Sequence, residues 1–229
     1  MIRKRTITRL TLTMSLAGIL FVCNNLPSQG QNASDMPALP FNAVVIRHMV
    51  ADYSRWRPIF DADSTFRNSA GMHPVGVARG IENENEVEVP FMIDDVQKAK
   101  AFTTDPKLKD AMQKGGVSSE PNIKFVKVLR MTDALKEPGD FVEVSHKVKD
   151  FDAWLKVFDG EGAETRAKDG LYDGLLARGI DDPNLVYLVF KITDLSKAKA
   201  ALDKPERQKT MKDAGVIGKP EIYFGRDQQ

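Results

Sequence analysis

One stretch of this sequence is written twice. Residues 145–162 read SHKVKDFDAWLKVFDGEG, and residues 47–63 read RHMVADYSRWRPIFDAD, with His, Asp, Trp and Phe-Asp at the same spacing. The match continues at an offset of 98 residues, and of 99 after one insertion, for almost the length of a small domain. This period is too long for a solenoid unit. We therefore interpret the sequence as two copies of one domain, residues 41–130 and 141–229, joined by a linker at residues 131–140.

The pattern inside each copy predicts six elements. In the second copy, residues 142–148 alternate as a strand, with His146 and valines on one face. Asp150 is a good N-cap for a helix that ends near Gly170. Two strands, a helix interrupted at Lys204-Pro205, and a short final strand follow at 171–180, 184–192, 194–215 and 220–224. The order β-α-β-β-α-β predicts an α+β, ferredoxin-like fold for each copy.

Such a unit covers only one face of its sheet with helices. The other face of the second copy carries Phe141, Leu185, Tyr187 and Val189, together with Glu143, Ser145 and Lys147. Its apolar members are too many to leave in water. We therefore predict that the two copies pack sheet to sheet into one closed body, an intramolecular pseudo-dimer.

The first thirty residues have the layout of a secretory signal. Four basic residues lie near the start, an uncharged run spans 10–22, and Ser28-Gln29-Gly30 suits a signal peptidase. We predict a signal peptide at 1–30, a flexible segment at 31–40, and an exported protein that is periplasmic or extracellular. Cys23 is the only cysteine, and lipid attachment there is the less favoured alternative because Val22 precedes it.

The remaining composition excludes several functions. After residue 30 the chain has 29 basic and 32 acidic residues, so we expect no nucleic-acid partner. The apolar run at 10–22 is too short for a comfortable membrane span, and we expect no transmembrane segment. No phosphate-binding loop, dinucleotide fingerprint or paired-histidine zinc motif is present, so we expect no cofactor and no metal.

The repeated motif, with its β-β-α-β remainder, resembles the dimeric α/β-barrel superfamily, which contains antibiotic-biosynthesis-monooxygenase-like domains. The resemblance covers nearly all residues after 41, and the tandem copies replace a homodimer. It implies a barrel in which small molecules bind between the helices and the sheet of each unit. Haem-degrading members use an Asn, a Trp and a His elsewhere in the fold, and that set has no counterpart here.

The two related histidines are the candidate catalytic bases. His48 and His146 lie on the strand face that we assign to the helices, and an imidazole there is a natural base near neutral pH. The alternative is a structural histidine, hydrogen-bonded to a helix N-terminus or to Asp52 and Asp150. Trp56 and Trp154 lie on the apolar stripe of the facing helix, as ligand contacts or simply as core.

Three further residues are candidate ligand contacts. Arg79 and Arg178 end a strand and suit an anionic substrate, or else they pair with Asp61 and Asp159. Tyr172 replaces His73, so its phenol would serve one copy only. By contrast, we expect Arg67, Arg166 and both Lys-Ala-Lys-Ala runs (98–101 and 197–200) to face solvent.

Together these features predict an exported α/β-barrel protein that binds a small aromatic or hydrophobic molecule. An enzymatic form of this function would be cofactor-independent and monooxygenase-like or cyclase-like. The alternative is a non-catalytic structural or interaction protein in which the histidines and tryptophans only complete the core. Clefts filled by the protein's own side chains, with His48 and His146 fully buried, would exclude the enzymatic form, whereas an open pocket with an imidazole at its wall favours it.

Overall fold

The computed structural model describes residues 38–228. The signal peptide predicted at 1–30, Cys23 and most of the segment at 31–40 lie outside the described residues. Among those described, no helix is long and apolar enough to cross a membrane.

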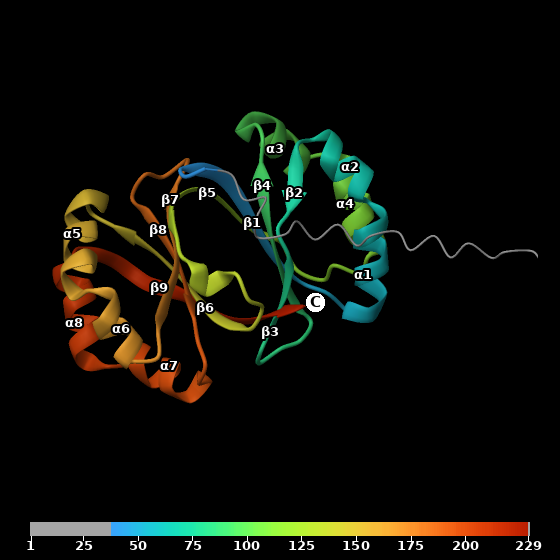
Figure 1. Cartoon of the computed structure of the whole chain (residues 1–229). Coiled ribbons are helices and arrows are strands. Elements are labelled where there is room, and N and C mark those ends of the chain that lie inside the picture. The colour runs from blue at the N-terminus through green and yellow to red at the C-terminus, as the bar shows by residue number, and fades with distance from the viewer. Residues whose placement is uncertain (1–37, 229) are drawn as a thin grey trace, which may run out of the picture.

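Both halves of the chain have the predicted element order, with each helical region divided in two (Figure 1). The first half consists of β1 (Phe41–Met49), α1 (Tyr53–Ala62), α2 (Ser64–Ser69), β2 (Met72–Pro74), β3 (Val77–Gly80), β4 (Glu86–Ile93), α3 (Val96–Thr103), α4 (Pro106–Lys114) and β5 (Asn122–Met131). A short 3-10 helix, η2 (Asp133–Leu135), leads to the second half. That half consists of β6 (Asp140–Val148), α5 (Phe151–Glu161), α6 (Ala163–Lys168), β7 (Tyr172–Gly179), β8 (Leu185–Lys191), α7 (Leu195–Leu202), α8 (Pro205–Asp213) and β9 (Val216–Gln228).

The strands close into one antiparallel barrel. Their order is β1-β5-β7-β8-β6-β9-β3-β4, and β4 pairs again with β1 to complete the ring, while β2 pairs with β4 beside β3. The α+β barrel predicted from the sequence is therefore confirmed. The structure adds that the halves also share edges, because β5 hydrogen-bonds to β7 and β9 to β3. Closure removes the free sheet edges that each half alone would expose.

The final strand is much longer than the predicted 220–224. Val216 pairs with Val148 in its own half, and residues 225–228 continue onto β3 of the first half. Figure 1 shows the chain's C-terminal end beside β3, across the molecule from α8. A strand that must pair with both halves extends beyond the hydrophobic run that marks it in the sequence.

Local signals explain where the helices begin and divide. The side chain of Asp150 accepts a hydrogen bond from the Ala153 amide at 2.7 Å, and Asp52 does the same for Ser54 at 2.8 Å. The predicted continuous helix up to Gly170 is instead two helices, because Gly162 has a φ of +80° and breaks the helical path. This break turns α6 back over the sheet.

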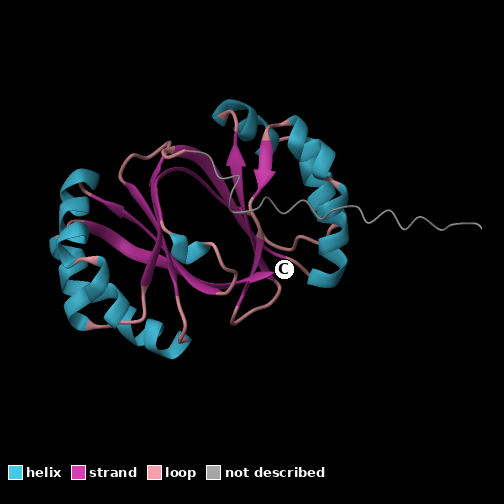
Figure 2. Cartoon of the chain, in the orientation of Figure 1, coloured by secondary structure: helices cyan, strands magenta, loops and turns pink. Residues whose placement is uncertain are grey.

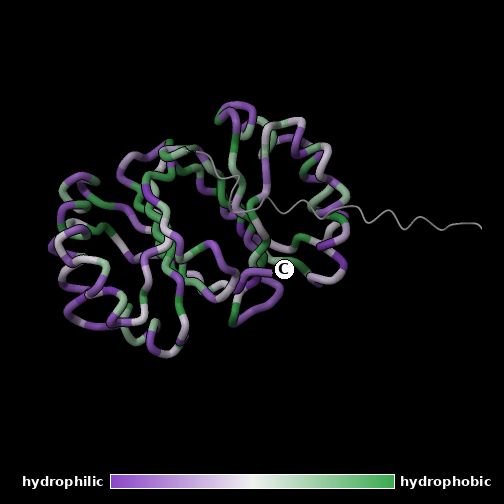
Figure 3. The backbone as a smooth tube through the Cα atoms, in the orientation of Figure 1, coloured by the Kyte–Doolittle hydropathy of each residue, from purple (hydrophilic) through white to green (hydrophobic). Residues whose placement is uncertain are grey.

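The helices form two separate outer layers, one on each side of the barrel (Figure 2). Each layer encloses its own apolar core between helices and sheet, one centred on Val44, Trp56 and Phe91 and the other on Val142, Trp154 and Phe190. Figure 3 shows hydrophobic stretches along the strands and hydrophilic ones along the helices, as amphipathic elements require. A third core lies inside the barrel and uses both halves, with Val45 and Val126 from the first and Ala177 and Tyr187 from the second.

The tetrapeptide Ala-Arg-Gly-Ile occurs at 78–81 and at 177–180, and both occurrences help to close the barrel. The amide of Ile81 donates to the Phe224 carbonyl at 2.9 Å, and Ile180 donates to Phe125 at 2.9 Å, so each tetrapeptide ends on the other half. The glycines permit a close approach of the adjoining hairpin. A Cβ at Gly80 would lie 2.7 Å from the carbonyl oxygen of Asn83, and one at Gly179 would overlap that of Asp182.

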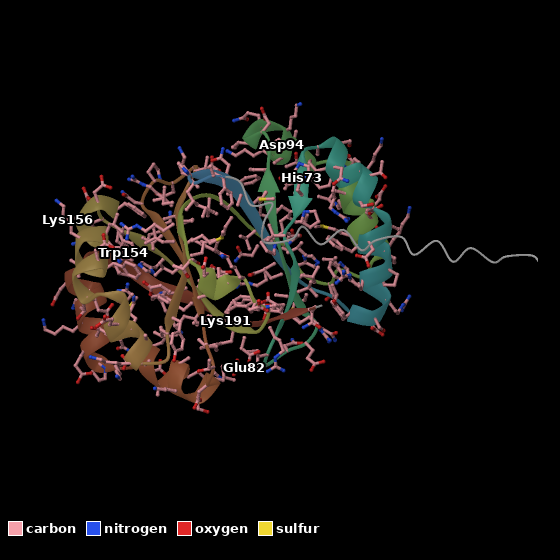
Figure 4. All side chains as sticks on the ribbon, viewed as in Figure 1. His73, Glu82, Asp94, Trp154, Lys156 and Lys191 are labelled. Carbon is pink, nitrogen blue, oxygen red and sulfur yellow. The ribbon has the colours of Figure 1, made fainter. Side chains whose placement is uncertain are left out.

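One lysine from each Lys-Ala-Lys-Ala run also bridges the halves. Lys100 on α3 forms an ion pair with Asp181, and Lys199 on α7 forms the equivalent pair with Glu82. Figure 4 labels Glu82 at the hairpin that follows β3, on the side of the molecule facing α7. The prediction that these runs only face solvent is therefore wrong for Lys100 and Lys199, because each lysine reaches the hairpin of the other half from the last turn of its helix.

A buried charge cluster lies inside the barrel. Glu88 and Glu143 are 3% and 1% exposed. Arg47 lies 3.6 Å from Glu88 and 3.7 Å from Glu143, and Lys124 lies 3.5 Å from Glu143. The Tyr187 hydroxyl donates to Glu143 at 2.9 Å. Burial, and then the neighbouring Glu143 charge, raise the pKa of Glu88 well above its usual range, which favours the protonated form of Glu88 beside Glu143.

Replacing Gly179 by Ala should destabilise the fold by about 1–3 kcal/mol, because the new methyl group overlaps the hairpin backbone. Gly76→Ala is the matched control, since a Cβ there meets no atom within 4 Å. Urea unfolding of both variants measures the difference. Equal stability of the two variants would contradict the close-approach explanation.

Glu88→Gln should make the fold less sensitive to alkaline pH. The unfolded carboxyl titrates near 4.5 and the folded one at a raised pKa, so wild-type stability falls as pH rises through that interval. Glutamine keeps a hydrogen-bonding group but cannot ionise. We expect its stability relative to wild type to grow with pH in urea titrations, whereas the exposed Glu120→Gln should show a constant difference.

Candidate functional site

Two equivalent clefts lie between helices and sheet, one in each half. The first cleft is a cavity of about 60 Å³ between β1, β4 and helices α1 to α4, and its walls include Ile46, His48, Trp56, Phe60, Phe91 and Arg67. The second cleft, of about 70 Å³, lies between β6, β8 and helices α5 to α8, and its walls include Val144, His146, Trp154, Phe158, Phe190 and Arg166. A water molecule needs only about 10–15 Å³, whereas an apolar cavity that binds benzene measures about 150 Å³. Each cleft therefore suits a small group, or the end of a larger ligand.

Strand alternation and helix periodicity bring one imidazole and one indole together in each cleft. His48 follows Val44 and Ile46 on the helix-facing side of β1, and the ring centroid of Trp56 on α1 lies 5.8 Å away, edge to face. In the second cleft the His146 and Trp154 centroids are 5.6 Å apart. Figure 4 labels Trp154 on α5, in the outer helical layer of the second half.

Both histidines are buried without hydrogen-bond partners. They are 6% and 5% exposed, and within residues 38–228 neither nitrogen of either ring has a partner. Burial lowers the pKa of His48 to about 4 and that of His146 to about 4. Both rings are therefore neutral near pH 7, and each presents one N–H donor and one acceptor nitrogen to its cleft. A small molecule that accepts and donates a hydrogen bond would relieve this cost.

The hydrogen bonds that a structural role predicted for these histidines do not form. Asp52 and Asp150, which were its expected acceptors, bind the backbone amides of Ser54 and Ala153 at the helix starts. These carboxylates therefore cap the helices and do not hydrogen-bond to the imidazoles, which remain unpaired.

Sequence reasoning missed two arginines that line the clefts. Arg67 and Arg166 were expected to face solvent, but they are 5% and 3% exposed. Each guanidinium stacks over an aromatic ring, Phe60 at 3.9 Å and Phe158 at 3.8 Å, and donates to the carbonyl of that same residue. The expectation is wrong because the break between the two helices turns this arginine inward. Its identical position in both copies was the available signal.

The other predicted contacts lie outside both cavities. Arg79 stacks on Tyr53 at 4.2 Å and pairs with Glu84 at 3.0 Å, while Arg178 stacks on Phe151 at 4.4 Å and lies 3.7 Å from Asp152. Both arginines brace a hairpin against a helix start.

The pairs that were expected for these arginines do not form. Asp61 pairs with Arg57 at 2.9 Å and Asp159 with Arg130, so neither carboxylate is available to Arg79 or Arg178. The side chains of α1 and of β5 lie closer to these carboxylates than the hairpins do.

Tyr172 and His73, which occupy related positions, are also outside the clefts. Tyr172 is 41% exposed at the start of β7. The Nε2 atom of His73 lies 3.0 Å from a carboxylate oxygen of Asp94, and Figure 4 shows these two side chains together near β2 and α3. Within residues 38–228, no group of three or more His, Cys, Asp or Glu side chains is arranged to hold a metal ion.

Comparison with protein-family models and with curated proteins finds no match. Solved structures are similar in fold. An "anthrone oxidase-like protein" shares 12% identity over 82% of this chain and 92% of its own, with a TM-score of 0.55. A "Putative Chlorite dismutase" shares 15% identity over 83% and 95%, with a TM-score of 0.52. A "Putative monooxygenase" from Fusobacterium nucleatum shares 12% identity over 85% and 94%, with a TM-score of 0.50.

These likenesses show that the chain has the fold of dimeric α/β-barrel proteins, here within a single chain. At such low identity they carry the fold and not the activity.

Replacing His48 and His146 together by Gln should make the protein more resistant to acid. The unfolded imidazoles take up protons below about 6.5 and the folded ones only near 4, so wild-type stability is lost as pH falls across that interval. The loss is about 3 kcal/mol per imidazole. Urea midpoints measured between pH 7 and 4 should fall less in the double variant. His73→Gln, at a half-buried histidine outside the clefts, should follow wild type.

Proposed function

We propose that this protein binds a small hydrophobic molecule in its helix–sheet clefts, with His48 and His146 as the polar contacts. The observation that carries the proposal is the pair of buried imidazoles, both with unpaired nitrogens and both at the wall of a cavity. A core histidine of purely structural use would normally have its polar atoms satisfied, because an unpaired buried donor costs about 1–3 kcal/mol.

The rest of the cleft supports an apolar ligand body. Trp56 stacks on Phe60 with centroids 4.8 Å apart, and Trp154 stacks on Phe158 at 5.1 Å. Half-buried Leu108 and Met112 on α4 form part of the first rim. Flexible methionine side chains adapt to ligands of different shape, so a ring larger than the cavity enters by moving this rim.

The enzymatic form of the proposal is a cofactor-independent reaction on the bound molecule. A neutral imidazole accepts a proton from an acidic CH2 group of the ligand. In a monooxygenase the carbanion then reacts with dioxygen, so that the CH2 group becomes a carbonyl and the other oxygen atom leaves as water, which takes up the proton. In a cyclase the carbanion adds to a carbonyl of the same molecule, and the imidazolium returns its proton to the new alkoxide. Because the folded imidazolium is unstable in this apolar cleft, the resulting anion must stay beside the ring. Oxygen consumption in the presence of a bound compound distinguishes the two chemistries.

Ligand binding should disappear when the imidazoles are removed. We expect aromatic compounds that carry a hydrogen-bonding group to raise the Tm of the wild-type protein by several degrees at hundredfold excess over Kd. They should also shift the side-chain resonances of His48 and His146, and His48→Gln/His146→Gln should lose both effects while His73→Gln keeps them. A panel in which no compound binds, combined with a double variant that is merely less stable, would establish the structural alternative.

Export is part of the proposal. It is supported by the basic start, the uncharged run at 10–22 and the lack of cysteine after Cys23. Expression of the full chain in a bacterium, followed by sequencing of the mature N-terminus, should show cleavage after Gly30. An intact start contradicts export, and a lipid on Cys23 would support the lipoprotein alternative.

A further inference from the structure

The two clefts differ in how their arginine is neutralised. In the second cleft, Arg166 donates to both carboxylate oxygens of Asp173, at 2.8 and 2.6 Å, and lies 3.3 Å from Glu161. It also donates to the Phe158 carbonyl at 2.7 Å. This guanidinium is buried, but two acids compensate its charge.

The guanidinium in the first cleft has no such compensation. Arg67 is 5% exposed and donates to the Phe60 carbonyl, but its Nε is buried without a partner, and no carboxylate within residues 38–228 forms an ion pair with it. Asp63, which also lines this cleft, and Asp61 raise its pKa without forming an ion pair with it, and the Arg57 charge acts in the opposite direction. Burial therefore lowers the pKa of Arg67, whereas the acids raise that of Arg166.

One position accounts for most of this difference. Asp173 pairs with Phe190 in the sheet, and the residue in the same register of the first half is Pro74, which pairs with Phe91. Proline supplies neither a charge nor an acceptor on its side chain. The first cleft has thus a buried cation, an unpaired donor and an unpaired neutral imidazole around one cavity of about 60 Å³.

We infer that the first cleft binds an organic carboxylate, with the carboxylate on Arg67 Nε and the His48 ring and the apolar body against Trp56, whereas the second cleft binds uncharged molecules. This inference rests on the proposed function and specifies the ligand of one of its two sites. An anion satisfies both the buried charge and the open donor of Arg67, which no neutral ligand does. In the second cleft both lining arginines already have acidic partners, Arg166 in Asp173 and Arg207 in Glu161 and Asp169, so an anion would find no uncompensated charge there.

The chain contains only two tryptophans, one in each cleft, so their fluorescence reports ligand binding to each cleft separately. Trp154→Phe leaves Trp56 as the reporter of an intact first cleft, and Trp56→Phe leaves Trp154 for the second. Fluorescence titrations would use butanoate and its uncharged isostere butanamide. We expect butanoate to perturb Trp56 and not Trp154, and butanamide to bind at least about tenfold more weakly than butanoate in the first cleft.

Two substitutions in the Trp154→Phe background test the role of the charge. Pro74→Asp gives Arg67 the counter-charge that Arg166 has, and Arg67→Gln removes the cation, so each should weaken butanoate binding about tenfold or more. Thermal unfolding verifies that both variants fold, and the first keeps Arg67 in place.

The outcomes separate the inference from the proposed function. Equal binding of acid and amide at Trp56, an equal butanoate affinity at Trp154, or no response of Trp56 to butanoate overturns the anion assignment. Unchanged affinity in Pro74→Asp and Arg67→Gln does so too. The wider proposal fails only if neither tryptophan responds to any compound of the aromatic panel.

Discussion

The structure depends on one constraint, which is that a four-stranded sheet covered by helices on one face cannot remain alone in water. Each half buries its uncovered sheet face against that of the other half, and hydrogen bonds join both pairs of sheet edges. Closure determines the length of β9, the approach of the hairpins at Gly80 and Gly179, and the lysine bridges between the halves. It also leaves the outer faces, under the helices, as the places where cavities remain.

The barrel interior shows that the halves are not interchangeable. Arg47 and Lys124 of the first half meet Glu143 and Glu221 of the second, and Lys124 lies 2.7 Å from Glu221. When the two halves of the sequence are aligned, the positions that correspond to these four residues are Ser145, Tyr223, Val45 and Asn122, in that order. Two copies of one half would therefore not form the same ion pairs, and a buried charge without its partner is strongly destabilising. The chain has a matched interior that a homodimer of either half would lack.

The clefts show the opposite pattern, because their central residues are the same in both halves while their surroundings differ. The imidazole and indole have the same placement and the same burial, but the neutralisation of the neighbouring arginine does not. This shared pocket chemistry with a different charge balance is the physical basis for the proposal that the two clefts take different ligands.

The sequence by itself determined the element order, the closed barrel and the pairing of one histidine with one tryptophan in each half. These follow from short-range periodicity and from an apolar sheet face that must be buried, and both patterns can be recognised in the sequence. Only the tertiary structure decided which charged groups are buried. Arg67 and Arg166 turn inward because a helix breaks, and Glu88 meets Glu143 because strands from opposite halves face each other inside the barrel. Burial and charge balance depend on contacts between distant segments, so no local pattern records them.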